Sequence, residues 1–459
     1  MQSAVSVVAD AAVPAQGVAL SRQLRAVAQA LHAVRQGRSG TAVLESVAPA
    51  LRPGVQALLF QVLRHLGCAQ ALGRVLAPRK PAPAVDALLC VALALCCDQE
   101  QALYEPFTLV NQTVEAAKQE AGTRAQAGFL NACLRRFLRE SASLLQAVSN
   151  DVQAQWNHPD WWVQRLRQDH PQHWQQVLQA NRRQAPMVLR VNLQKNTLLQ
   201  YHQALEVAGI GAVAVGEAGL ILQQAVPVQT LPGFAQGWVS VQDAAAQQAA
   251  PLLLAGMDLS QPLRVLDACA APGGKTAHLL EYAGVGAPLQ VTALEIDSQR
   301  AQRIHETLER LGLHAQVLVA DASRPQDWWQ QQCGGALFDA ILLDAPCTAS
   351  GIVRRHPDVP WLRRESDIAQ LAFIQARLLD TLWPLLQPGG RLLYCTCSVF
   401  RAEGSAQVQA FLARNTTARH LSSPGHLLPG VDVAGRIVPD NPEGEHDGFF
   451  YALLQKDLA

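Results

Sequence analysis

Two cysteines in separate segments are the residues of this chain best suited to chemistry. Cys347 ends the run Leu-Asp-Ala-Pro-Cys, and Cys397 lies in Tyr-Cys-Thr-Cys-Ser, residues 394–398. Each segment follows an apolar, strand-like run, and open α/β sheets bind their ligands at the carboxyl ends of strands. A glycine-rich turn precedes both, residues 267–276, with the sequence Asp-Ala-Cys-Ala-Ala-Pro-Gly-Gly-Lys-Thr. The combination indicates a thiol nucleophile beside a bound nucleoside-type cofactor.

The glycine-rich turn follows a predicted strand and opens a predicted helix, where small residues let the backbone approach a ligand. Glu295 ends the next predicted strand, about 20 residues further on, where a nucleoside site needs an acceptor for ribose hydroxyls. A phosphate loop requires glycine where this chain has Cys269, and a nicotinamide site requires Gly-x-Gly-x-x-Gly. The turn therefore favours neither a nucleoside triphosphate nor a nicotinamide cofactor.

Two more acidic residues follow predicted strands, Asp321 after the third and Asp344 after the fourth. With Glu295 they would supply contacts to ribose, to an adenine amine and to the substrate. The alternative is structural, because an Asp after a strand often caps the helix that follows.

Composition predicts a large protein of the cytoplasm with reduced thiols. The chain has 459 residues, 49% of them apolar, which suggests about three domains. Its ten cysteines have no framework spacing, and the first 20 residues do not resemble a signal peptide. The longest apolar run, Ala87–Cys97, is shorter than the ~20 residues of a membrane span, so we expect a buried helix there. Net charge is zero, with basic residues in excess near the N-terminus.

The pattern of elements divides the chain into four parts. Residues 1–20 are expected to be a poorly ordered tail, and residues 21–148 a helical bundle without strands. Residues 149–235 are expected to form a small α+β domain, whose helical tryptophans are read as core residues rather than as stacking platforms for bases. In residues 236–459 strands alternate with helices, which predicts a Rossmann-like α/β domain with a mostly parallel sheet and helices on both faces.

The three motifs together resemble the RNA cytosine-C5 methyltransferases that use S-adenosylmethionine. Within them the chain is most similar to the bacterial 16S ribosomal RNA methyltransferases of the RsmB/Fmu/Sun group, whose N-terminal domain is NusB-like. Further segments carry the likeness, and these are Gly128–Arg136, His158–Trp161, Leu189–Asn192, Gly237–Val239 with Gln242 and Asp243, Arg354–Asp358 and Asp447–Phe450.

The resemblance implies a role for each matching residue. Cys397 would be the nucleophile, Cys347 would assist product release, and Asp344 would contact the target base. The residues implied in binding S-adenosylmethionine are Cys269, Ala270, Ala271, Pro272, Gly273, Gly274, Lys275, Glu295, Asp321 and Asp344. Arg354, Arg355 and His356 would hold RNA phosphates, unless they form an ordinary solvated basic turn. We expect 16S ribosomal RNA as partner, no membrane, no metal and a monomer.

The implied reaction explains why a thiol nucleophile is needed. Carbon C5 of cytosine is a poor nucleophile, and addition of a thiolate to C6 activates it toward a methyl donor. Two positions depart from the family pattern, since Thr348 replaces a serine and Cys395 is an additional thiol. Two other functions stay open, a transfer-RNA cytosine-C5 methyltransferase and a non-catalytic RNA-binding assembly factor.

Overall fold

The computed structural model describes residues 18–97, 103–430 and 445–458. Most of the expected N-terminal tail, residues 1–17, lies outside these ranges. The described residues form two compact units. The first contains the chain up to Arg165 together with residues 181–183 and 355–363, and the second contains the rest. Each unit is described by itself.

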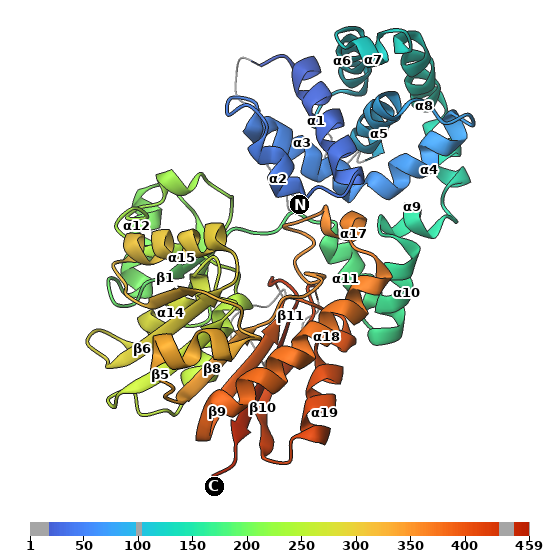
Figure 1. Cartoon of the computed structure of the whole chain (residues 1–459). Coiled ribbons are helices and arrows are strands. Elements are labelled where there is room, and N and C mark those ends of the chain that lie inside the picture. Colours follow the sequence, from blue (N-terminus) through green and yellow to red (C-terminus); the bar gives the residue numbers. More distant parts are fainter. Residues whose placement is uncertain (1–17, 98–102, 431–444, 459) are drawn as a thin grey trace, which may run out of the picture. The chain divides into compact units, whose positions relative to one another are not determined.

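The first unit is helical (Figure 1), as the periodicity predicted. Its central helix, α5 (Pro83–Cys97), is buried along most of its length, because its apolar residues face neighbouring helices on every side. This helix contains the long apolar run of the sequence. No helix within the described ranges is long and apolar enough to span a membrane. The other principal helices are α1 (Leu20–Arg35), α3 (Arg52–Arg64), α4 (Leu66–Leu76), α6 (Pro106–Lys118) and α8 (Ala127–Ala147).

Shorter helices complete the first unit. They are α2 (Gly40–Glu45), α7 (Ala121–Arg124), α9 (Val152–Trp156), the first part of α10 (Asp160–Asp169) and α17 (Val359–Leu362). Trp162 in α10 is fully buried, which agrees with the predicted core role, whereas Trp156, Trp161 and Trp174 are only half-buried. Asp358, just before α17, accepts a hydrogen bond of 2.8 Å from the backbone N–H of Gly40 at the start of α2. A segment close to the Cys347 motif in sequence thus belongs to the helical unit.

The second unit contains a small antiparallel sheet. Its strands, in the spatial order β2-β3-β1-β4, are β1 (Val188–Val191), β2 (Ala212–Val215), β3 (Gly219–Leu222) and β4 (Val239–Val241). Leu189 and Leu220 of this sheet pack on Tyr201 and Leu205 of α12 (Leu198–Val207). Strand β4 pairs with β1 and lies beyond residue 235, so the sheet extends past the boundary predicted from sequence.

The larger sheet of this unit has seven strands in the order β10-β11-β9-β8-β5-β6-β7. Strands β5 to β9 are parallel, and β11 is antiparallel to both β9 and β10. Their bounds are β5 (Leu263–Ala268), β6 (Leu289–Glu295), β7 (Gln316–Val319), β8 (Phe338–Asp344), β9 (Leu386–Thr396), β10 (Ala418–Leu427) and β11 (Phe449–Lys456). The predicted alternation is confirmed. Strand β10 had no recognisable pattern, because most of its residues are polar or half-exposed.

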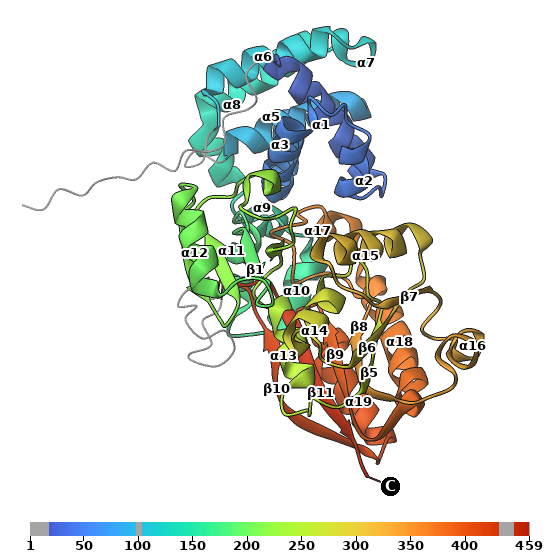
Figure 2. The ribbon, with the colours of Figure 1, turned by 90° about the vertical axis from the view of Figure 1, so that its left-hand side faces the viewer.

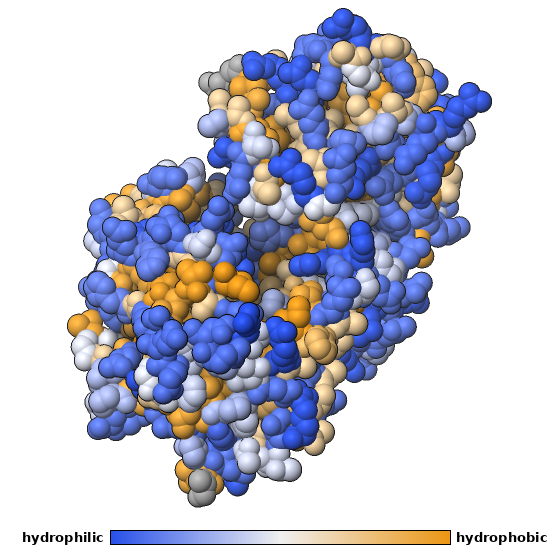
Figure 3. Space-filling view, in the orientation of Figure 1, coloured by the Kyte–Doolittle hydropathy of each residue, from blue (hydrophilic) through white to orange (hydrophobic). Residues whose placement is uncertain are grey.

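Helices cover both faces of the large sheet, as Figures 1 and 2 show. One face packs on α13 (Ala249–Leu254), α14 (Gly274–Ala283) and α15 (Ser298–Leu311). The other face packs on α16 (Trp329–Cys333), α18 (Glu365–Leu382) and α19 (Ser405–Arg414). The Rossmann-like architecture with helices on both faces is therefore confirmed. On the face drawn in Figure 3, hydrophilic residues cover most of the surface, with smaller hydrophobic areas among them.

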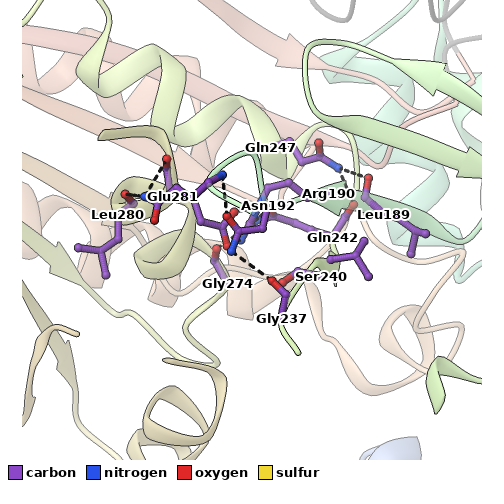
Figure 4. A network of polar contacts seen from close by, with 12 residues as sticks. Leu189, Arg190, Asn192, Gly237, Ser240, Gln242, Gln247, Gly274, Leu280 and Glu281 are labelled. Atoms are coloured by element: carbon purple, nitrogen blue, oxygen red, sulfur yellow. Dashed lines mark hydrogen bonds and ion pairs between the residues drawn. The ribbon is translucent and has the colours of Figure 1, made fainter. Parts of the chain in front are cut away.

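A buried ion pair joins the small sheet to helix α14, which packs on the large sheet (Figure 4). Arg190 of β1 donates two hydrogen bonds of 2.9 Å to the carboxylate of Glu281 in α14, and the two side chains are 0% and 4% exposed. Arg190 also donates to the side chain of Gln242 and to the carbonyl oxygen of Gly274. Because α14 begins at Gly274, these hydrogen bonds fix the first turn of that helix against β1.

Candidate active site

The chemically competent residues come together at one edge of the large sheet, where the parallel strands end. The glycine-rich turn follows β5, Glu295 ends β6, Asp321 follows β7, Asp344 ends β8, and Cys397 follows β9. In a parallel sheet the carboxyl ends of all strands lie at the same edge. Side chains separated by up to 130 residues in sequence thereby share one site.

The glycine-rich turn adopts a backbone that few residues tolerate. Cys269 has φ +76° and Gly273 has φ +97°, both in the left-handed region. A Cβ atom at Gly273 would lie 3.1 Å from the backbone of Ile304 in α15, a tight contact that adds to the preference for glycine there. The turn is held by hydrogen bonds from the N–H groups of Cys269 and Ala270 to the carbonyl oxygen of Leu294. The N-terminus of α14 thus begins directly at the site, with its partial positive charge.

Asp267, at the end of β5, is a site residue that the sequence analysis did not single out. Its side chain is fully buried, and burial raises the pKa of its carboxyl to about 7. Thr276 donates a hydrogen bond of 2.6 Å to one oxygen, whereas the other oxygen has no partner. Buried polar atoms are nearly always hydrogen-bonded, so the unpaired Oδ1 marks an acceptor for a bound group. The signal in the sequence was the same as for Asp344, an acidic residue at a strand end.

Glu295 and Asp321 differ in the hydrogen bonds that their carboxylate oxygens already accept within the protein. Glu295 is 3% exposed; its Oε1 accepts from the N–H of Asp297, and its Oε2 has no hydrogen bond but lies 3.4 Å from Arg300. Asp321 Oδ1 accepts from both the N–H and the hydroxyl of Ser323, at 2.8 and 2.7 Å. Asp321 therefore stabilises a local turn, and it does not cap a following helix, which was the structural alternative.

Asp344 is the centre of a charged group beside the turn. Its Oδ2 lies 2.7 Å from the ammonium of Lys275, and the thiol of Cys395 lies 3.5 Å from its Oδ1. Burial lowers the pKa of Lys275, but the neighbouring Asp344 carboxylate outweighs that effect and raises it, so the lysine stays protonated. Burial also raises the pKa of Cys395 well above its usual range. The additional thiol is therefore a protonated neighbour of Asp344.

The two motif cysteines are in direct contact. The sulfur atoms of Cys347 and Cys397 lie 3.4 Å apart, although the residues are 50 positions apart in sequence. The hydrogen bond to Cys397, together with burial, raises the pKa of Cys347 well above its usual range. Cys347 therefore keeps its proton and can donate it in a hydrogen bond to the sulfur of Cys397. Cys397 is the more exposed of the two.

A buried carboxylate, Glu403, connects the two cysteine segments. It is fully buried and accepts hydrogen bonds from the N–H and hydroxyl of Thr348, from the hydroxyl of Ser398 and from the side chain of Gln375. Thr348 adjoins Cys347 and Ser398 adjoins Cys397. Burial raises the pKa of Glu403. Sequence analysis missed this residue, because an isolated Glu in a loop carries no pattern of its own.

Two glycines bring a further segment against the site. A Cβ atom at Gly351 would lie 2.0 Å from the carbonyl oxygen of Gly448. The N–H of Gly448 donates a hydrogen bond of 2.8 Å to the carbonyl oxygen of Gly351. The N–H of Gly351 in turn donates to the carbonyl oxygen of Cys397. Only glycine permits this approach of the three chain segments.

Arg354, one of the three residues predicted to hold RNA phosphates, has a different role. It is 3% exposed and pairs with Asp447 at 2.7 Å, Glu445 at 2.9 Å and Asp243 at 3.9 Å. Its charge is neutralised inside the protein, so the prediction of a phosphate contact is wrong for this arginine. Arg355 and His356 belong to the first unit and are half-buried, and their RNA contacts stay a prediction.

The sheet order and the glycine-rich turn after β5 give the second unit a Rossmann-like fold. The family described as "16S rRNA methyltransferase RsmB/F" matches residues 255–455, and a ferredoxin-like domain of RsmF/B-like methyltransferases matches residues 158–229. The chain belongs to this RsmB/F family.

Named relatives and a solved structure agree with that assignment. Ribosomal RNA small subunit methyltransferase B of Vibrio cholerae is 46% identical over 76% of this chain and 76% of its own length. The protein of the same name from Klebsiella pneumoniae is 40% identical over 94% and 97%. The structure titled "Crystal Structure of PH0851" covers 95% of this chain and 99% of its own, with a TM-score of 0.73 and 23% identity, which shows a shared fold.

Proposed function

We propose that this protein transfers a methyl group from S-adenosylmethionine to C5 of a cytosine in 16S ribosomal RNA. The observation that carries the proposal is the 3.4 Å contact between Cys347 and Cys397 at the end of β9, beside the glycine-rich turn. The relatives named ribosomal RNA small subunit methyltransferase B support ribosomal RNA as the substrate. The finer proposal, cytosine C5 and a covalent intermediate, rests on the two thiols.

The residues at the strand ends fit S-adenosylmethionine. The close packing of Gly273 on Ile304 shapes the turn, and the unpaired Oδ1 of Asp267 is a buried acceptor beneath it. When bound, the cofactor would supply an electrophilic methyl group. The residues proposed to hold it are Cys269, Ala270, Ala271, Pro272, Gly273, Gly274, Lys275, Glu295, Asp321 and Asp344.

Each reacting side chain has a distinct part in the proposed cycle. Cys397, as thiolate, adds to C6 of the cytosine and makes C5 nucleophilic. Asp344, held by Lys275, stabilises the activated ring by a hydrogen bond at its N3 or its exocyclic amine. After methylation the C5 proton is removed and the bond between Cys397 and C6 breaks. Cys347 assists this release, because its sulfur lies beside that of Cys397.

The substrate must present an accessible base. A cytosine in a duplex cannot reach a thiol at the end of a sheet, so the target is unpaired or flipped out of its stack. We propose that residues 21–148 form a NusB-like RNA-binding domain, and that the protein acts as a monomer on free 16S RNA or an early assembly state.

Two cysteine variants test the mechanism. Cys397→Ala should abolish methyl transfer, whereas Cys347→Ala should let a covalent RNA adduct accumulate, visible as a band of low mobility on a denaturing gel. Cys333→Ala, which removes a buried thiol at the end of α16, is the matched control and should retain activity. If the adduct accumulates in the Cys397 variant instead, the roles are assigned wrongly.

Bisulfite sequencing of RNA from cells with and without the protein tests the substrate. Loss of one 5-methylcytosine from 16S RNA would support the proposal, and loss from transfer RNA alone would favour the transfer-RNA enzyme. Calorimetry without detectable S-adenosylmethionine binding would point to a non-catalytic assembly factor.

A further inference from the structure

A second pair of thiols lies in contact within the helical unit. The sulfur atoms of Cys68 and Cys97 are 3.4 Å apart. Cys68 lies in the first turn of α4, and Cys97 is the last residue of α5. Both residues are half-buried, so small oxidants can reach them.

The surroundings of Cys68 favour a reactive thiolate. The thiol of Cys97 donates a hydrogen bond to the sulfur of Cys68, and this bond, with the positive charge of Arg182, outweighs the opposing effects of burial and of Asp151 and lowers the pKa of Cys68. The position of Cys68 in the first turn of a helix adds the favourable field of the helix dipole. A lowered pKa is the usual mark of a redox-active cysteine.

Neighbouring cysteines in the same unit have the opposite character. Burial raises the pKa of Cys96 to about 12, although it adjoins Cys97 in sequence. Burial likewise raises the pKa of Cys90 and of Cys133. These thiols behave as small apolar side chains. The contrast within one helical bundle singles out Cys68.

We propose that Cys68 and Cys97 form a reversible disulfide-forming site, in which a peroxide oxidises Cys68 and Cys97 resolves the product. The Cys68 thiolate attacks one oxygen of hydrogen peroxide, which breaks the O–O bond, yields a sulfenic acid and releases hydroxide. The Cys97 sulfur then attacks the sulfenic sulfur, the S–S bond forms, and the hydroxyl leaves as water with the Cys97 proton. A dithiol reverses the reaction by thiol–disulfide exchange.

The geometry limits the movement that the disulfide requires. The sulfur atoms lie 3.4 Å apart and must approach to about 2.05 Å for the bond to form. The backbone of Cys68 is already fixed, since its N–H donates a hydrogen bond of 3.0 Å to the side chain of Asn157. A disulfide would then join the start of α4 to the end of α5. The site is independent of the function proposed above.

Mass spectrometry of the full-length protein tests the site. The protein is treated with hydrogen peroxide, the remaining thiols are alkylated, and the non-reduced peptides are analysed. We expect a linked peptide containing Cys68 and Cys97 and the loss of two titratable thiols, both reversed by dithiothreitol. The peptide linking Cys347 and Cys397 has a different mass and is counted separately.

Three variants make the assignment specific. Cys96→Ser should form the linked peptide as the wild type does, which identifies Cys97 as the partner. Cys68→Ser should form none. Cys97→Ser should accumulate the sulfenic acid of Cys68, trapped by dimedone, and this readout does not depend on forming the bond. If dimedone instead labels Cys96 or Cys90 before Cys68, or if Cys96→Ser abolishes the linked peptide, the proposal is overturned.

Discussion

Glu403 provides the sharpest test of how the two cysteine segments are held. Its carboxylate accepts hydrogen bonds from both cysteine segments, through Thr348 and Ser398. We predict that Glu403→Ala separates the segments and that Glu403→Gln largely preserves them. The first substitution removes every acceptor, and the second retains one oxygen and the shape of the side chain.

The structure sets the size of the effect. In Glu403→Ala the N–H of Thr348 and the side-chain NH₂ of Gln375 lose their shared acceptor. Each unpaired buried donor costs about 1–3 kcal/mol, so about 2–6 kcal/mol in total. In Glu403→Gln the amide oxygen can serve both donors, while the hydroxyls of Thr348 and Ser398 turn to accept from the new NH₂. That exchange costs about 0.5–1.5 kcal/mol.

Three measurements separate a positioning role from general damage. Methyl transfer to 16S RNA should fall about 100-fold in Glu403→Ala, as a misplacement of about 1 Å can cause, and less than about tenfold in Glu403→Gln. S-adenosylmethionine affinity should stay close to the wild-type value, because the hydrogen bonds of Glu403 go to the cysteine segments and α18. Thermal unfolding reports the stability loss. Wild-type activity in Glu403→Ala, or a parallel loss of cofactor affinity, would refute the reasoning.

Three further substitutions have predictable effects. Arg190→Ala leaves the carboxylate of Glu281 buried without its partner and should destabilise the second unit by about 3–5 kcal/mol in denaturant unfolding. Gly351→Ala should cost about 1–3 kcal/mol and lower activity, because its Cβ would overlap Gly448. Asp267→Asn should remove a pH dependence of stability. Burial raises the folded pKa from 3.8 to about 7, so the wild type loses up to about 4 kcal/mol as pH rises between those values.

Matched comparisons decide these outcomes. Gly128→Ala in α8, where an added Cβ meets nothing within 4 Å, should be neutral or stabilising, in contrast to Gly351→Ala. Arg190→Ala unfolding at the wild-type denaturant midpoint would contradict a structural role for the ion pair. The pH argument fails if the stability difference between wild type and Asp267→Asn stays constant from pH 4 to pH 8.

Local patterns in the sequence carried much of the fold and the cofactor side of the candidate site. Alternating apolar runs predicted the parallel strands, and the glycine-rich turn was recognisable because its composition follows from its own backbone geometry. The acidic residues Glu295, Asp321 and Asp344 were recognisable because each stands at or just after the end of a predicted strand. Strand β10 was not visible, because an edge strand with polar residues lacks the apolar period on which prediction depends.

Partners distant in sequence were decided only by the tertiary structure. Nothing near Glu403 indicated that it would meet Thr348, and nothing near Arg354 indicated that Asp447 would neutralise it. The contact of Cys347 with Cys397 likewise exists because β8 and β9 are neighbours in the sheet. Residue types and spacing determined which groups could react. Which charged side chains are buried and which thiols are in contact was determined by the tertiary structure, because burial and pairing between distant residues depend on the packing of the whole chain.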